Sequence, residues 1–237
     1  LQQSLKNAAQ CYVNAEKWIA AKTSFLRYAQ IFPENYDEVI EFTCQSGDMA
    51  YKAGQEDEAM SLYEEALLKY NQFNTAGKFV DAYFAAQAQF MIGEIQFNSY
   101  RDIELTPPLQ KNFKRKVAEF NNVAKSYTAT IKFQIADWST AASHRIGMSF
   151  EEFVRAFLES PIPADLDEEQ QATYKETLKQ RAQTYQDKAL ETYQKNIEQA
   201  EANNIENSWV ADSRKRIQAL TEELTEQTAV LNSVKGS

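Results

Sequence analysis

The chain contains few of the residues that interrupt helices. Its 237 residues include six glycines and five prolines, and the prolines fall at Pro33, Pro107–Pro108, Pro161 and Pro163. Proline inside a helix costs about 3 kcal/mol, so the proline-free stretches between these positions predict long helices. The sequence has no sustained alternation of apolar and polar residues and no Asn-Gly or Asp-Gly turn. Strands are therefore not expected, and the predicted fold class is all-α.

The residue types that carry most enzyme and metal chemistry are also scarce. There is one histidine, His144, and the two cysteines, Cys11 and Cys44, form neither a disulfide framework nor a metal-type spacing. The short motifs of zinc proteases, dithiol enzymes, serine hydrolases and nucleotide-binding enzymes are missing. We therefore predict that the chain is not an enzyme and that it holds no cofactor and no metal.

The charge balance is acidic. Asp and Glu number 34 against 25 Lys and Arg, which gives a formal net charge of -9. Such a field repels a phosphate backbone, so no nucleic-acid partner is expected. The two basic runs, 111–116 and 214–216, are interpreted as solvated helix faces, with docking of an acidic partner as the alternative. No apolar run approaches the roughly 20 residues that span a bilayer, so no membrane-spanning helix is expected.

Two segments near the N-terminus repeat one pattern of small and aromatic residues. Ala21 and Phe25 in the first correspond to Ala59 and Tyr63 in the second, and 59 − 21 gives a separation of 38 residues. Small residues let two antiparallel helices approach closely, and a ring four residues later fills the space beside them. The second segment has three further positions of the pattern, namely Gly47, Gly54 and Ala66.

This pattern resembles the tetratricopeptide repeat, a unit of two helices and 34 residues. The resemblance implies an α-α superhelix, a solenoid in which the helix pairs continue one another without a break. It implies two repeats in residues 1–77, two elongated helix pairs in 78–204, and a capping helix and tail in 205–237.

The later part of the chain keeps the pattern in a stretched form. Gly93 and Gly147 match Gly47, at separations of 93 − 47 = 46 and 147 − 93 = 54 residues. Both separations exceed 34, so the helices after residue 78 are expected to be longer by several turns. One apolar seam at steps of three and four predicts a single helix over about 167–203, with Asp167 as its N-cap.

The resemblance also implies a function, because repeats of this family hold a partner protein or peptide in a concave groove. Aligning the helix pairs assigns seven residues to that groove: Asp48, Tyr51, Phe90, Glu94, Phe97, His144 and Met148. Aromatic rings beside two carboxylates would suit a partner segment with apolar anchors and a basic residue. In the alternative interpretation, Phe90 and Phe97 pack against neighbouring helices, and His144 is a half-buried helix residue without a functional role.

A second resemblance concerns residues 138–220, which begin W-S-T-A-A-S-H-R-I-G-M-S-F and later read K-A-L-E-T-Y and N-S-W. They resemble long-helix tetratricopeptide proteins of deltaproteobacterial cell envelopes, including proteins of gliding motility. This implies a bacterial scaffold or adaptor in the periplasm or cell envelope, with the cytoplasm as the alternative compartment. Because the sequence starts at Leu1, we expect it to be part of a longer protein. A structural spacer or self-association module of that protein is the alternative function, and the oligomeric state stays open.

Overall fold

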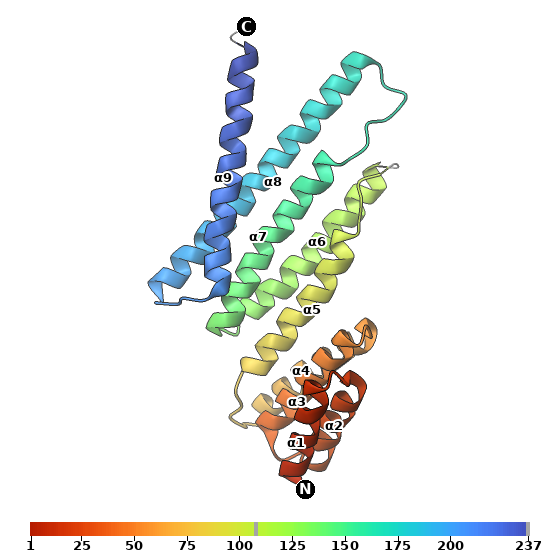
Figure 1. Ribbon diagram of the computed structural model, residues 1–237, viewed down its shortest axis with the longest axis vertical. Coiled ribbons are helices and arrows are strands. Elements are labelled where there is room, and N and C mark those ends of the chain that lie inside the picture. Colours follow the sequence, from red (N-terminus) through yellow and green to blue (C-terminus); the bar gives the residue numbers. More distant parts are fainter. Residues whose placement is uncertain (107–108, 236–237) are drawn as a thin grey trace. The chain divides into compact units, whose positions relative to one another are not determined.

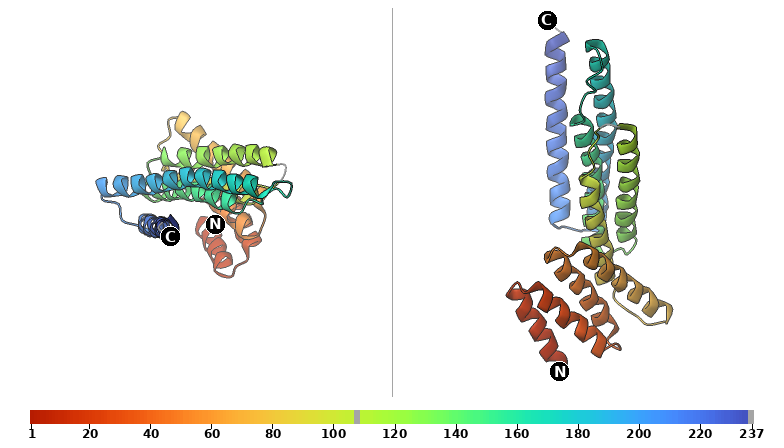
Figure 2. Two further views of the ribbon diagram at one scale, coloured as in Figure 1. Left: turned by 90° about the horizontal axis from the view of Figure 1, so that it is seen from above. Right: turned by 90° about the vertical axis from the view of Figure 1, so that its right-hand side faces the viewer.

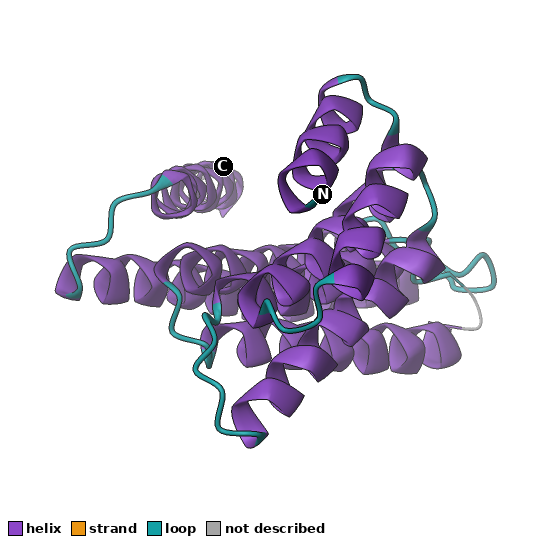
Figure 3. Cartoon of the chain, turned by 90° about the horizontal axis from the view of Figure 1, so that it is seen from below, coloured by secondary structure: helices purple, strands orange, loops and turns teal. Residues whose placement is uncertain are grey.

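The computed structural model describes residues 1–106 and 109–235, with side chains described up to Glu222. Every regular element within these residues is a helix, which confirms the predicted all-α fold (Figures 1 and 3). The helices are α1 (Gln2–Asn14), α2 (Trp18–Ile31), α3 (Tyr36–Lys52), α4 (Glu56–Thr75), α5 (Tyr83–Arg101), α6 (Leu109–Ile131), α7 (Ala136–Leu158), α8 (Glu168–Ala202) and α9 (Ser208–Lys235). None of these helices, within the described ranges, combines the length and apolarity of a membrane crossing.

The chain divides into two compact units, and each is described by itself. Unit 1 comprises Leu1–Gln96 with Ala129–Trp138, and unit 2 comprises Phe97–Thr128 with Ser139–Ser237. Helices α1 to α4 belong to unit 1 and α8 and α9 to unit 2, whereas α5, α6 and α7 contribute residues to both. The sequence-based boundaries at residues 77 and 204, and the superhelical arrangement, stay predictions.

In unit 1, α1 to α4 form consecutive helix hairpins (Figure 1). The backbones pack closely in the order α1 with α2, α2 with α3, and α3 with α4. Ala21, Ala59 and Ala66, which the repeat pattern places at close helix approaches, are completely buried. The core around them combines rings and small residues, as the pattern predicts, with aliphatic residues such as Leu62 and Ile92.

The turn between α1 and α2 and the turn between α3 and α4 share one geometry. Glu16 and Gly54 both have a positive φ, of 54° and 74°, and 54 − 16 gives the same separation of 38 residues as the side-chain pattern. In both turns the N–H of the following residue donates to the carbonyl five residues earlier, at 2.9 Å. Glycine adopts this left-handed conformation without steric cost, but a residue with a Cβ pays about 1 kcal/mol. Glu16 therefore adopts the turn geometry of Gly54 at a position where the sequence has no glycine.

Unit 2 contains longer helices, of which α6, α7 and α8 run side by side (Figures 1 and 2). Helices α6 and α7 have 23 residues each and α8 has 35, against 13 to 20 in α1 to α4, whereas α5, with 19 residues, is not lengthened as predicted. The α8 helix begins with a capping box, in which the Asp167 carboxylate accepts from the Gln170 backbone N–H at 2.9 Å and the Gln170 side-chain oxygen accepts from the Asp167 backbone N–H at 3.1 Å. These two bonds satisfy N–H groups that the first helical turn leaves without partners.

An aromatic cluster forms the core of unit 2. Phe153 of α7 stacks on Tyr185 of α8, with ring centres 4.5 Å apart, and Phe120 of α6 lies 5.3 Å from Phe153. The predicted seam of α8 faces inward, with Leu178 and Tyr193 among its buried residues. The predicted cap, 205–237, is represented by α9, which packs on α8; its side chains after Glu222 lie outside the described residues.

Candidate functional site

Among the predicted groove residues of unit 1, Asp48 lies in a helix contact and has two side-chain partners. The Asp48 carboxylate accepts hydrogen bonds from the Tyr63 hydroxyl and from the Gln87 amide, both at 2.8 Å. Burial raises the pKa of Asp48 to about 6, although these two bonds and nearby Lys52 favour the charged form. At neutral pH this carboxylate is therefore mostly ionised inside the contact between α3, α4 and α5.

The aromatic residues of this part of the predicted groove are largely covered by helix packing. Phe90 is buried, with its ring centre 5.3 Å from that of Trp138. Tyr51 is half-buried against the cluster that contains Tyr63, and Glu94 is half-buried as well. Phe90 thus takes the position described by the alternative interpretation, packing against a neighbouring helix.

In unit 2, the predicted residues Phe97, His144 and Met148 also lie in helix contacts. Phe97 is buried, and the Arg145 guanidinium lies 5.6 Å from its ring centre. Met148 is half-buried beside Tyr193, and its sulfur accepts from Arg145 at 3.2 Å. His144 is buried, deeper than the half-buried position that its alternative interpretation assumes. Binding of a partner by these residues stays a prediction.

His144 belongs to a buried polar network that could not be predicted from the sequence. Its Nδ1 lies 3.0 Å from the Ser213 hydroxyl, which donates to the Trp209 carbonyl at 3.0 Å. The same hydroxyl accepts from the Asn196 amide at 3.0 Å, so His144 Nδ1 is the donor in its own bond. Burial, followed by the charge of Arg145, lowers the pKa of His144 to about 4. The ring is therefore neutral at pH 7 and joins α7 to α9.

Two of the sequence-marked glycines mark a contact that we call the glycine–tyrosine joint. A Cβ added at Gly47 would lie 2.6 Å from Tyr63 Cε1, and one added at Gly147 would lie 2.6 Å from Tyr193 Cζ. Both tyrosines are completely buried. Each ring therefore lies directly on the backbone of the preceding helix, at a distance that only glycine permits.

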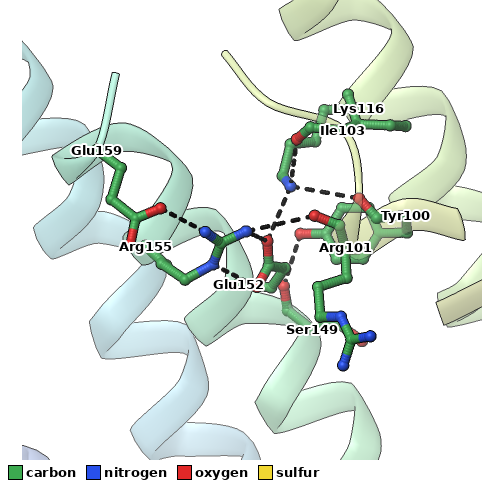
Figure 4. A network of polar contacts seen from close by, with 8 residues as sticks. All are labelled: Tyr100, Arg101, Ile103, Lys116, Ser149, Glu152, Arg155 and Glu159. Atoms are coloured by element: carbon green, nitrogen blue, oxygen red, sulfur yellow. Dashed lines mark hydrogen bonds and ion pairs between the residues drawn. The ribbon is translucent and has the colours of Figure 1, made fainter. Parts of the chain in front are cut away.

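A second buried network, shown in Figure 4, contains Lys116 of α6. The Lys116 ammonium is 0% exposed and donates to the Ile103 carbonyl at 2.8 Å, to Glu152 at 3.0 Å and to the Tyr100 carbonyl at 3.3 Å. Burial lowers the pKa of Lys116, and the bond to Glu152 opposes this shift. All three ammonium hydrogens thus have partners.

Lys116 departs from the interpretation of the basic run 111–116 as a solvated helix face, whereas the other three basic residues of the run are exposed, as that interpretation states. Lys116 lies on the apolar face of α6, three residues after Phe113, four before Phe120 and seven before Val123. That spacing was the available signal, because a charged residue on an apolar stripe needs a buried partner.

Glu152 holds two cations at once. Its carboxylate accepts from the Arg155 guanidinium at 2.9 and 2.6 Å, and Arg155 also pairs with Glu159 (Figure 4). Beside them the Tyr100 hydroxyl donates to the Ser149 carbonyl at 2.8 Å. Lys116 and Glu152 are the buried pair of this group, and removing one partner of a buried pair typically costs about 3–5 kcal/mol because it leaves a charge without compensation. The arrangement is suited to holding the end of α5 against α6 and α7.

Unit 2 also contains a surface cavity of about 350 Å³, here called the α7–α8 cavity. It lies between the end of α7, the loop that follows it and the first half of α8. Its apolar lining includes Phe157, Leu158 and Leu178, and its polar lining includes Lys175, Lys179 and Gln186. Side chains at this cavity are available to a ligand, in contrast to the networks above.

Neither a metal site nor a similarity to known proteins indicates a further functional site. In the parts of the chain that the structure describes, no cluster of His, Cys, Asp and Glu side chains is arranged to hold a metal ion. The two cysteines are unbonded, Cys11 exposed on α1 and Cys44 buried on α3.

No protein-family model matches the chain, and a comparison with curated proteins gives no match either. The function is therefore argued from the residues themselves.

Proposed function

We propose that the chain is a protein-interaction scaffold of the tetratricopeptide type, which binds a partner protein or peptide on the surface of stacked helix hairpins. The observation that carries this proposal is the glycine–tyrosine joint, which recurs at Gly47 and Gly147. A recurring joint between consecutive helices is the mechanical requirement of a repeat stack, and repeat stacks act through their extended surfaces.

The distribution of polar groups supports the same proposal. The half-buried Asp48 and the buried Lys116 and His144 each hold neighbouring helices together through hydrogen bonds. In each unit these groups are therefore engaged in structure. The side chains that remain for recognition lie at surface cavities, which is the arrangement of a binding module.

The setting of the scaffold is a further part of the proposal. The resemblance of residues 138–220 to envelope proteins favours a role in a bacterial cell-envelope or motility assembly. A proteomic comparison of periplasmic, membrane-associated and cytoplasmic fractions of the source cell would test it. Recovery of the protein only in the cytoplasmic fraction would contradict the envelope setting without affecting the binding proposal.

The binding proposal is tested by capture followed by reconstitution. The tagged chain is exposed to lysate of its source, retained proteins are identified by mass spectrometry, and each candidate is purified and titrated into the chain by calorimetry. We expect one identified protein to bind with defined stoichiometry. A control chain carrying Tyr63→Ala and Tyr193→Ala, which loses both joints, should not bind it. If no candidate binds the folded chain better than the control, the scaffold proposal is wrong.

Self-association is the alternative function, and a cleft in unit 1 favours it. This open cleft, about 780 Å³ in volume, is lined by Tyr12, Trp18 and Ile19, and Ile19 is 50% exposed. Exposed apolar side chains gathered in this way are typical of association surfaces. Light scattering across a concentration series distinguishes the two functions. A dimer that Ile19→Glu converts to monomer would support self-association, and a monomer at all concentrations would exclude it.

A further inference from the structure

The α7–α8 cavity is lined by a side-chain amide that has no protein partner within the described residues. Gln186 of α8 is only 5% exposed and lines the cavity, and among the described residues no hydrogen bond is made by its side chain. A buried amide is costly unless its donor and its acceptor are both satisfied. The neighbouring polar groups are already occupied, since Ser160 donates to the Leu105 carbonyl at 2.9 Å and Gln183 donates to Asp187 at 2.9 Å. Gln186 is thus the polar group that this cavity offers to a ligand.

Two lysines stand at the rim of the same cavity. Lys175 and Lys179 lie one helical turn apart on α8, and both are exposed. Within the described part of the chain, neither forms an ion pair, although the protein carries a net charge of -9. Like charges at this spacing repel each other, and an anion bound between them would relieve the repulsion. The rim is therefore complementary to a carboxylate.

The remaining lining is apolar. Phe157 and Leu178 form buried walls, whereas Leu158 is 59% exposed beside them. A cavity of about 350 Å³ is at the small end of ligand sites and accommodates one or two apolar side chains. The cavity thus combines an apolar wall, an amide inside it and a positive rim.

We propose that the α7–α8 cavity binds an extended peptide segment of a partner protein, in which an apolar side chain is next to an acidic residue. This proposal rests on the scaffold function and identifies the surface and partner chemistry that serve it. The amide of Gln186 favours a peptide over a fatty acid, because a peptide group supplies both an acceptor and a donor. An acyl chain would fill the apolar part but leave Gln186 unpaired.

The test uses the full chain and a displayed library of random short peptides. We expect selected peptides to be enriched in Asp or Glu adjacent to Leu, Ile, Met or Phe. The best sequences are then synthesised with a fluorescent label, and their affinity is measured by anisotropy. The double variant Lys175→Glu/Lys179→Glu should weaken binding by about tenfold or more, and it should improve binding of matched peptides in which the acids are replaced by lysine.

Two further variants keep the test specific. Gln186→Leu removes the amide without leaving a buried polar group, so it should fold normally and weaken peptide binding by about fivefold or more. The matched control is Lys111→Glu/Arg115→Glu, an exposed basic pair with the same spacing on α6 that is not among the cavity residues. This control changes the net charge equally and should alter affinity less than about twofold.

Several results would overturn this assignment. The selected peptides could lack an acidic residue next to an apolar one. The control Lys111→Glu/Arg115→Glu could change the peptide affinity as much as Lys175→Glu/Lys179→Glu does, or dodecanoate could displace the peptide. The failure is distinguishable from failure of the scaffold function. If a partner identified by capture binds Lys175→Glu/Lys179→Glu as tightly as the unaltered chain, the scaffold stands and this surface is not where the partner binds.

Discussion

The same contact is built twice in this molecule, once in each unit, with different electrostatic surroundings. In unit 1 the ring of Tyr63 lies on Gly47, and in unit 2 the ring of Tyr193 lies on Gly147. Each tyrosine hydroxyl donates to a carboxylate on the helix that carries the glycine, Asp48 in unit 1 and Glu151 in unit 2. The steric part of the joint is therefore common to both units.

The carboxylates differ in position and in partners. Asp48 directly follows its glycine and is held by the neutral donors Tyr63 and Gln87. Glu151 stands one turn after its glycine and also accepts from Arg216 of α9, with a distance of 3.0 Å to Arg216 Nε. The comparison shows that the glycine and the ring determine how closely the two helices pack. The negative charge of the carboxylate that accepts from the tyrosine is compensated differently in each unit, by the groups of the neighbouring helices.

The largest expected effect is loss of the ring itself. Tyr63→Ala and Tyr193→Ala should each destabilise the chain by about 3–5 kcal/mol, because each ring is fully buried and its removal leaves a cavity. Hydrogen exchange should locate the loss in α3 and α4 for the first variant and in α7 and α8 for the second. Tyr12→Ala, at an exposed ring, is the control and should change stability by less than about 0.5 kcal/mol. Equal losses of stability in all three variants would show that the rings of the two joints contribute no more to stability than an exposed ring.

Acidity should act on the joint of unit 1 through Asp48. Because the pKa of Asp48 is raised to about 6 in the folded chain from an ordinary value of 3.8, folding takes up a proton between these values. Its contribution to stability therefore falls as the pH rises from about 4 to 6. Asp48→Asn should remove this dependence on pH. Between pH 4 and pH 7, the free energy of unfolding of the variant should therefore rise by about 1–3 kcal/mol relative to that of the unaltered chain. A constant difference between the two chains across denaturant titrations in this range would contradict the assignment.

The buried histidine of unit 2 should respond with the opposite sign. The pKa of His144 is lowered to about 4 from 6.5, so folding releases a proton between these values. Stability is therefore lost as the pH falls from about 6.5 to 4, by roughly 1–3 kcal/mol. His144→Gln should abolish this loss, and exchange measured on α7 to α9 peptides should show it locally. Unchanged acid sensitivity in the variant would assign the effect to other groups.

The smallest effect concerns the cation that unit 2 adds to its joint. Arg216 is partly exposed, so its pair with Glu151 is screened by solvent. Arg216→Gln should cost about 0–1 kcal/mol at low salt and less at high salt. A loss as large as that of Tyr193→Ala would mean that the ion pair, and not the ring, holds the joint. Urea titrations at two salt concentrations provide the comparison.

The helices and their small contact positions could be predicted because they depend on local patterns. Scarce breakers and the apolar seam place α8 within about one residue of 167–203, and Ala21 and Ala59 are buried as the repeat pattern requires. The turn at Glu16 could not be predicted, because its positive φ is imposed by the hairpin and not by a glycine.

The candidate sites were harder to predict because each depends on distant partners. Lys116 is buried because Glu152, 36 residues later, lies opposite it. Phe90 and Phe97 have ring positions that suit either a groove or a helix contact, since a helix in a stack is covered on more than one side. The α7–α8 cavity depends on the path of the loop after Leu158, for which the sequence offers only Pro161 and Pro163 as markers.

A double-mutant cycle on Gly147 and Tyr193, repeated on Gly47 and Tyr63, tests most directly whether glycine and ring form one steric device in both units. Gly→Ala alone should destabilise by about 1–3 kcal/mol, because the added Cβ meets the ring. In the background of Tyr→Leu, which removes the ring, the same change should stabilise by about 0.5–1 kcal/mol, since alanine is the better helix former. A reversal of sign in both units is the predicted result. An equal effect of Gly→Ala in the two backgrounds would contradict the joint.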